Sequence, residues 1–81
     1  MDTLDLTIDS CPVVMTEQQV VLFNLPACSA CEKVKRILQN NQIEFNVVDL
    51  RQCNRAVGLS NEVYAAPTLL RKAAGKIEVI L

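Results

Sequence analysis

Between positions 20 and 50 the spacing of apolar residues changes twice, and this pattern leaves few folds open to the chain. Residues 20–23 form a continuous apolar run, which is typical of a strand buried on both faces. From residue 28 to about residue 40 the apolar residues recur at the period of an amphipathic helix. Alternation over residues 43–50 predicts a second strand. A strand, a helix and a strand within roughly 30 residues form a βαβ unit, so the two strands should be parallel.

Side-chain spacing also predicts which residues of these elements share a face. The apolar stripe of the helix consists of Cys31, Val34, Ile37 and Leu38. On the second strand Ile43, Phe45 and Val47 lie on one side, opposite Glu44, Asn46 and Val48. The aromatic residues Phe23, Phe45 and Tyr64 are assigned to the core.

The C-terminal part of the chain predicts a β-hairpin, with strands at residues 68–71 and 76–81 and a turn at residues 72–75. Residues 52–63 have a weak helical pattern, which Gly58 interrupts. We therefore expect one α/β domain over residues 20–81, built as a mixed four-stranded sheet with helices.

Residues 1–19 are interpreted as an N-terminal extension of this domain. Residues 3–9 alternate strictly, with Leu4, Leu6 and Ile8 on one side. This segment is expected to form an added strand or a strap packed on the core.

Composition excludes several classes of function. The 81 residues include no histidine, which removes Ser/His and Cys/His nucleophile pairs and mixed Cys/His zinc sites. A net charge of −1 argues against nucleic acid as a partner, and no apolar run reaches the roughly 20 residues that span a bilayer. The acidic residues 1–5 are unlike the start of a secretory signal, so we expect a cytoplasmic protein without membrane partners.

Cysteines carry the remaining reactive chemistry, and Cys28 and Cys31 open the predicted helix. The first of them lies beside unpaired N–H groups and the positive end of the helix dipole. Such positions lower a cysteine pKa from about 8.5 to roughly 3.5–7.5. We therefore expect Cys28 to attack a substrate disulfide and Cys31 to resolve the mixed disulfide. The plainer alternative is that both are small buried apolar residues.

A second candidate site is Ala66-Pro67, just before the predicted hairpin. Proline cannot donate to a sheet, so it suits the first position of a strand, and this is the purely structural explanation. In the functional explanation Pro67 is a cis-proline beside the thiols, and Ala66 offers its backbone to an extended substrate. X–Pro bonds are trans by default, so these residues alone do not decide between the two.

Residues 20–81 resemble the glutaredoxin branch of the thioredoxin superfamily. The resemblance rests on the strand at 20–23, the Cys28-x-x-Cys31 motif, the helix residues 34–38, the strand at 43–50 and Ala66-Pro67-Thr68-Leu69. It implies a thioredoxin-like fold, here without the usual final helix. It also implies a dithiol–disulfide oxidoreductase, with Cys28 as nucleophile, Cys31 as resolving thiol and Pro67 as the cis-proline.

The resemblance further implies the partners. These are disulfide-containing proteins and glutathione adducts, with glutathione or a flavin-dependent reductase as electron source and no tightly bound cofactor. Glutaredoxins usually carry Pro-Tyr between the cysteines and often a lysine just before the motif, and both features help to hold glutathione. Here Ser29-Ala30 and residues 24–27 stand in these places. The motif itself carries thiol–disulfide exchange.

Cys11 and Cys53 are the other two thiols. Cys11 lies outside the region of resemblance and is interpreted as incidental. Cys53, near the start of the predicted second helix, is interpreted as a small half-buried residue, with a regulatory thiol as the alternative. No metal site is assigned, because one Cys-x-x-Cys and two scattered cysteines are poorly spaced for four-thiolate binding.

Two functions of other classes stay open at this point. One is a metal or iron–sulfur carrier that uses Cys28 and Cys31 across a dimer, or together with Cys11 and Cys53. The other is a redox-inactive binding module with the thioredoxin fold.

Overall fold

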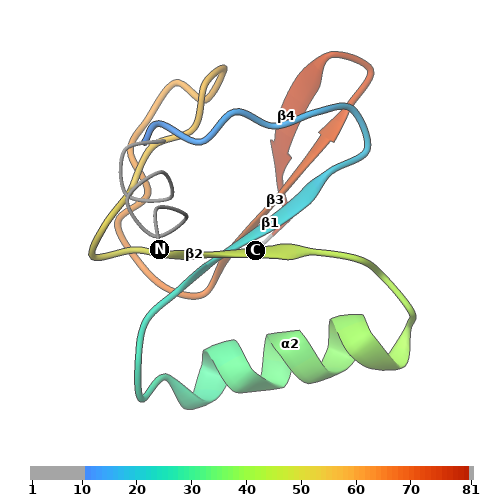
Figure 1. The fold of residues 1–81 in the computed structure, drawn as a ribbon, viewed down its shortest axis with the longest axis vertical. Helices are drawn as coiled ribbons and strands as arrows, with labels where there is room; N and C mark the ends of the chain where they lie inside the picture. The colour runs from blue at the N-terminus through green and yellow to red at the C-terminus, as the bar shows by residue number, and fades with distance from the viewer. Residues whose placement is uncertain (1–10, 81) are drawn as a thin grey trace, which may run out of the picture.

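The computed structural model describes residues 11–80 and shows a mixed four-stranded sheet with one helix in that range (Figure 1). The elements follow in this order: strand β1 (Val20–Asn24), helix α2 (Ser29–Asn40), strand β2 (Asn46–Asp49), strand β3 (Thr68–Ala73) and strand β4 (Lys76–Val79). The sheet order is β2-β1-β3-β4, with β1 and β2 parallel and the other pairs antiparallel. The predicted βαβ unit and hairpin are confirmed. The fold is α/β and thioredoxin-like, without a final helix in the described residues.

Strand β1 is the centre of the sheet and of the core. Val21, Leu22 and Phe23 have no exposed surface, because β2 and β3 flank the strand and other segments cover both faces. Successive side chains point to opposite faces, so the core has two halves. One half contains Val20, Leu22, Leu38 and Leu69, and the other contains Met15, Val21, Phe23, Ala56, Val63 and Leu70. The prediction of a strand buried on both faces is confirmed.

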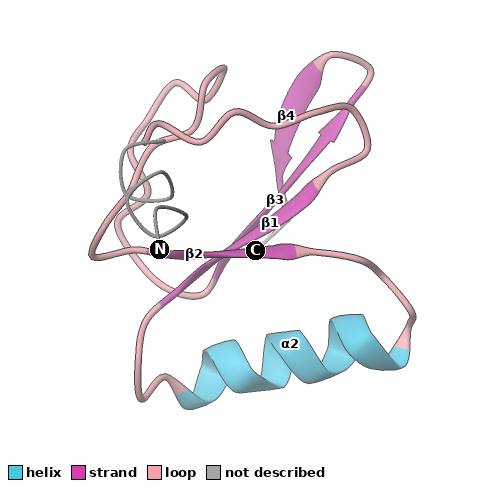
Figure 2. Cartoon of the chain, viewed as in Figure 1, coloured by secondary structure: helices cyan, strands magenta, loops and turns pink. Residues whose placement is uncertain are grey.

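Helix α2 covers the first half of the core (Figure 2). Cys31 and Leu38 are buried, and Val34 packs against the sheet. Ile37 is 59% exposed, which corrects its assignment to the same stripe. With about 3.6 residues per turn Ile37 lies at the margin of the stripe, and among residues 11–80 no second helix packs beside α2 to cover it. No helix in this range is long and apolar enough to cross a membrane.

A strap, residues 11–19, and an irregular loop, residues 50–67, cover the second half of the core. Figure 1 shows both segments on the side of the sheet that faces away from α2. The Val13 N–H donates to the Arg55 carbonyl at 3.0 Å, and the Val57 N–H donates to the Val13 carbonyl at 2.8 Å. The strap and the loop are therefore held to each other as well as to the sheet.

The loop contradicts the predicted second helix at residues 52–63. Its first turn is closed by the Asp49 carbonyl, which accepts the Cys53 N–H at 3.1 Å, but the helix does not continue. Arg55 and Val57 instead bond to the strap. A distant segment thus supplies hydrogen-bond partners to the Arg55 carbonyl and the Val57 N–H, so the weak local helical preference is overridden.

Strand β2 is shorter than predicted, because residues 43–45 lie outside it. The Ile43 N–H donates to the Leu38 carbonyl at 2.9 Å and closes the end of α2. Of the side chains expected on one side, Phe45 packs on the core, whereas Ile43 and Val47 are 42% and 48% exposed. Val47 lies in β2, which is an edge strand of the sheet, and Ile43 lies before it, in the segment that follows α2.

The side of the hairpin that faces the same way as α2 is charged. Arg71 of β3 is paired with Glu78 of β4, and their side chains form an ion pair at 3.1 Å. In the thioredoxin fold the final helix would lie over this surface. The ion pair therefore lets that surface face water without a helix. The strand predicted at residues 3–9 lies outside the described residues and stays a prediction.

Candidate functional site

Residues 24–28 carry the chain from β1 into α2. Ala27 has a φ of 56°, and Cys28 is the N-cap residue with an extended backbone (φ −103°, ψ 104°). The Cys31 N–H donates to Cys28 Sγ at 3.1 Å, and the Glu32 N–H donates to the Cys28 carbonyl at 3.2 Å. The Cys28 sulfur thus lies at the N-terminus of the helix, where free N–H groups and the helix dipole favour negative charge.

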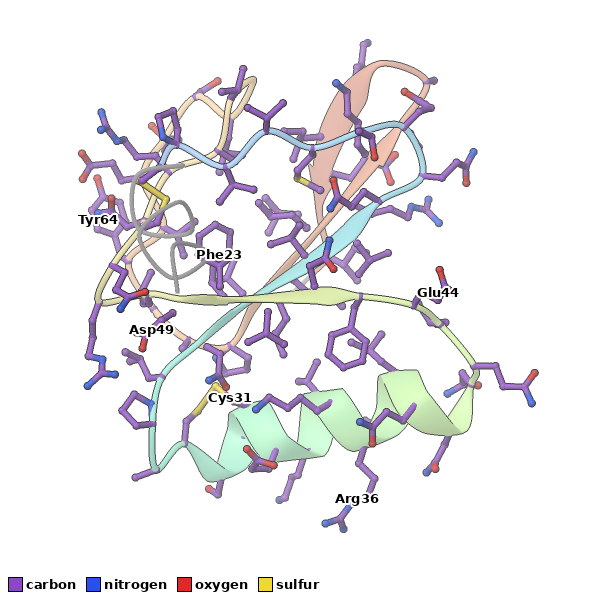
Figure 3. The ribbon with its side chains drawn as sticks, in the orientation of Figure 1. Phe23, Cys31, Arg36, Glu44, Asp49 and Tyr64 are labelled. Carbon is purple, nitrogen blue, oxygen red and sulfur yellow. A yellow bond between two sulfur atoms is a disulfide. The ribbon has the colours of Figure 1, made fainter. Side chains whose placement is uncertain are left out.

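Cys28 and Cys31 form a disulfide, with their Cα atoms 5.2 Å apart. The two residues differ in exposure: Cys31 has no accessible surface, whereas Cys28 is partly exposed. Figure 3 shows Cys31 on the first turn of α2, on the side toward the sheet. Exchange needs one sulfur that a partner can reach and a second sulfur close to the first. The pair meets both requirements.

Ala66 and Pro67 lie at the same end of the sheet as the N-terminus of α2. Strand β3 runs antiparallel to β1 and pairs Thr68 with Phe23, so the two residues before Thr68 stand beside the end of β1. The Ala66–Pro67 peptide bond is cis. Thr68 Oγ1 donates to the Ala65 carbonyl at 2.6 Å and closes the turn around this bond. Among the described residues no hydrogen bond uses the Ala66 N–H or carbonyl.

Comparison with known proteins assigns the chain to a protein family. The family model for glutaredoxin matches residues 20–64, more than half of the chain. The chain belongs to the glutaredoxin family. The match includes β1, the Cys28–Cys31 pair, α2 and β2, so the resemblance drawn from the sequence is confirmed. No curated protein and no solved structure matches the chain significantly.

The chain has a second disulfide that was not predicted from the sequence. Cys11 and Cys53 are joined across a sequence separation of 42, with their Cα atoms 5.3 Å apart. The interpretation of Cys11 as incidental is therefore wrong. Cys53 is buried, but it lies in the irregular loop and not in a helix. The number of cysteines could have indicated this disulfide: once Cys28 and Cys31 are paired, two cysteines remain and can pair with each other.

A backbone hydrogen bond holds the residue after β2 beside the end of β1, and an ion pair lies next to it. The Leu50 N–H, which follows β2, donates to the Asn24 carbonyl at 2.9 Å. The Asp49 carboxylate accepts bonds from Arg51 Nε (3.0 Å), from Arg51 Nη2 (2.7 Å) and from the Arg51 backbone N–H (2.9 Å). The side-chain bonds first, and then the backbone bond, hold the pKa of Asp49 below its usual value. This pair shapes the turn that leads to Cys53.

The three aromatic side chains have different positions. Phe23 is fully buried and Phe45 packs on the core, as predicted. Tyr64 is 80% exposed, so its assignment to the core is wrong (Figure 3). Its neighbour Val63 is buried instead and packs in the core with Phe23 and Leu70.

The cysteines do not gather into one cluster. All four are used in the two disulfides. Within residues 11–80 no group of three or more His, Cys, Asp or Glu side chains is placed to hold a metal ion. The alternative that combines Cys28 and Cys31 with Cys11 and Cys53 in one site therefore has no geometric support.

Proposed function

We propose that this glutaredoxin is a dithiol–disulfide oxidoreductase, with Cys28 as nucleophile and Cys31 as resolving thiol. The difference between the two sulfurs supports these roles: Cys28 is partly exposed at the N-cap of α2, and Cys31 is fully buried one turn later. An external disulfide reaches only the first of them. Once the pair is reduced, the Cys31 N–H and the helix N-terminus stabilise a thiolate at Cys28.

The proposed reaction moves two electrons from the protein to its substrate. The Cys28 thiolate attacks one substrate sulfur, forms a mixed disulfide, and expels the other sulfur as a thiolate that takes up a proton. Cys31 loses its proton and attacks Cys28 Sγ. The Cys28–Cys31 disulfide forms, and the substrate sulfur that was bonded to Cys28 leaves and takes up a proton. Two thiol equivalents from an electron donor then restore the dithiol.

Ala66 and Pro67 are the proposed substrate-binding residues. Within residues 11–80 the N–H and carbonyl of Ala66 have no hydrogen-bond partner, which suits an extended peptide that adds its own backbone hydrogen bonds. We therefore propose disulfide-containing proteins as the main substrates and glutathione mixed disulfides as the second class. The proposal includes neither nucleic acid nor membrane as a partner.

The proposed electron source is glutathione or a flavin-dependent reductase, and no tightly bound cofactor is required, because the reaction uses only sulfur chemistry. We place this activity in the cytoplasm, where a Cys-x-x-Cys pair cycles between its two states.

The first prediction tests the roles of the two cysteines with a dithiol reductase assay. Cys28→Ser should abolish reduction of both a protein disulfide and a glutathione mixed disulfide, because the accessible thiolate is lost. Cys31→Ser should accumulate mixed disulfides on Cys28, because nothing resolves them. Each variant is assayed with glutathione and with a flavin-dependent reductase as donor, which separates the two electron sources.

Cys11→Ser is the matched control, since it removes a cysteine outside the pair and should retain activity. Alkylation of Cys31 at low pH, with Cys28 inert, would reverse the assigned roles. Full activity of Cys28→Ser would show that Cys28 is not the nucleophile. Absence of reductase activity in the wild type would leave a redox-inactive binding module as the better description. Visible absorbance and bound iron in the purified protein would favour the cluster carrier.

A further inference from the structure

The Cys11–Cys53 disulfide lines a cleft of about 530 Å³ beside β2. The cleft also includes Asn24, the last residue of β1, and Asp49, the last residue of β2. Asn24 Oδ1 is buried and has no hydrogen-bond partner among the described residues. The second disulfide is thus placed at the wall of a cavity, beside the strand end from which the Cys28 segment departs.

The two sulfurs of this disulfide are unequal. Cys11 is partly exposed, whereas Cys53 is 7% exposed. Cys53 Sγ lies 3.4 Å from the Arg55 carbonyl, which would accept a hydrogen bond from a thiol at that position. An attacking thiolate can therefore reach Cys11. A reduced Cys53 thiol would have the Arg55 carbonyl as its hydrogen-bond acceptor.

We propose that Cys11–Cys53 is a second redox site, opened by small thiols of the glutathione class at Cys11. The thiolate attacks Cys11 Sγ and forms a mixed disulfide, and the displaced Cys53 sulfur takes up a proton and donates to the Arg55 carbonyl. A second thiol molecule attacks the mixed disulfide and frees the Cys11 thiol. Two thiols are oxidised to one disulfide, and the protein gains two electrons and two protons.

Opening this disulfide loosens a defined part of the fold, which we name the clasp: residues 11–14 and residues 53–57. Besides the disulfide, two backbone hydrogen bonds join the two segments of the clasp: the Val13 N–H donates to the Arg55 carbonyl, and the Val57 N–H donates to the Val13 carbonyl. The strap beyond it has its own anchors, since Met15 is 3% exposed and its carbonyl accepts a bond from Lys72 Nζ at 3.1 Å. Reduction should therefore release the clasp and leave residues 15–19 in place.

The test follows both disulfides of the wild-type protein in glutathione redox buffers, without denaturant. Free thiols are alkylated, and mass spectrometry assigns them to each cysteine. We expect Cys11–Cys53 to become reduced in the native protein, with the glutathione adduct on Cys11. Amide hydrogen exchange should show loss of protection at Val57 and Val13, and retained protection at Val21 in β1.

A matched pair of variants tests the difference between the sulfurs. Cys53→Ser leaves the partly exposed Cys11 thiol, which should take up glutathione readily. Cys11→Ser leaves the buried Cys53 thiol, which should resist the reagent. The same digests report the state of Cys28 and Cys31 separately. The result for Cys11 and Cys53 can therefore be read even if the proposed reductase activity is absent.

Three outcomes would overturn the proposal. The first is a Cys11–Cys53 disulfide that is reduced only after the protein is unfolded in urea, which is the behaviour of a structural crosslink. The second is an adduct found mainly on Cys53. The third is reduction with unchanged exchange at Val13 and Val57, which would show that the disulfide holds no clasp.

Discussion

At the scale of single residues, position within one helical turn distinguishes the two thiols of the pair. Cys28 and Cys31 are three residues apart, yet one is the N-cap and the other is the first buried residue of α2. The same local logic applies to Asp49, the last residue of β2, whose carboxylate is bonded twice by the Arg51 side chain. In both cases the position of the side chain at the end of a helix or strand determines which groups stabilise its negative charge.

The Asp49–Arg51 pair gives a prediction at this scale. Arg51→Ala should raise the pKa of Asp49 toward its usual value, because the largest cause of its lowering is the bond from the Arg51 side chain. The change should be incomplete, since the backbone N–H of residue 51 still donates to the carboxylate. A carboxyl NMR titration of Asp49 measures it, with Arg55→Ala as the control.

The sign of the pH effect follows from the direction of the shift. A carboxyl group whose pKa is lower in the folded protein stabilises the fold above its unfolded pKa. That contribution is lost as the pH falls through the lowered pKa of Asp49. The wild type should therefore lose more stability than Arg51→Ala on acidification, by a small amount because the pair is exposed. Equal acid sensitivity of both proteins would contradict this account.

At the scale of elements, α2 is held to the sheet by a narrow stripe. Leu38 is 5% exposed in the helix-side core, and its neighbour Ile37 faces water. We therefore expect these two adjacent residues to contribute very differently to the free energy of unfolding. Stability depends on the face that a residue occupies more than on its apolar character.

A matched pair of substitutions tests this difference. Leu38→Ala should lower the free energy of unfolding by about 2–5 kcal/mol, since it leaves a cavity between α2 and the sheet. Ile37→Ala should change it by less than about 0.5 kcal/mol, as an exposed helix substitution does. Urea unfolding of the oxidised protein measures both values. A cost for Ile37→Ala as large as that for Leu38→Ala would reveal an unrecognised partner for the outer face of α2.

Local pattern explains which elements could be predicted from the sequence. The strand at 20–24, the helix at 29–40 and the hairpin are each specified by their own spacing, and so is the pairing of Cys28 with Cys31. The loop at 50–67 could not be predicted, because its backbone partners lie in the strap. The Cys11–Cys53 disulfide and the exposure of Tyr64 could not be predicted for the same reason, because both depend on how the loop is arranged in space.

At the scale of the whole molecule, the two faces of the sheet are protected in different ways. One face has a regular helix, and the other has irregular segments joined by backbone hydrogen bonds and the Cys11–Cys53 disulfide. In reducing compartments a disulfide that persists is rare, and those that occur are catalytic or redox-sensing. A cytoplasmic location and a redox-responsive clasp therefore support each other as proposals.

The last prediction concerns residues 3–9, which precede the strap and lie outside the described residues. Strict alternation puts Leu4, Leu6 and Ile8 on one side of an extended segment, and Thr3, Asp5 and Thr7 on the other. If the first side packs on the domain, each aliphatic side chain contributes about 1.5–3 kcal/mol before the cost of ordering the segment. Replacing all three by serine should then lower the melting temperature or promote self-association.

Replacing Thr3, Asp5 and Thr7 by serine is the matched control, because it changes the same segment on its opposite side and should have little effect. Thermal unfolding and sedimentation measure both proteins, and the reductase assay should find the Cys28 chemistry intact in each. A deletion of residues 2–9 should behave like the aliphatic triple variant. If all three proteins keep the melting temperature and the association state of the wild type, residues 3–9 do not pack on the domain.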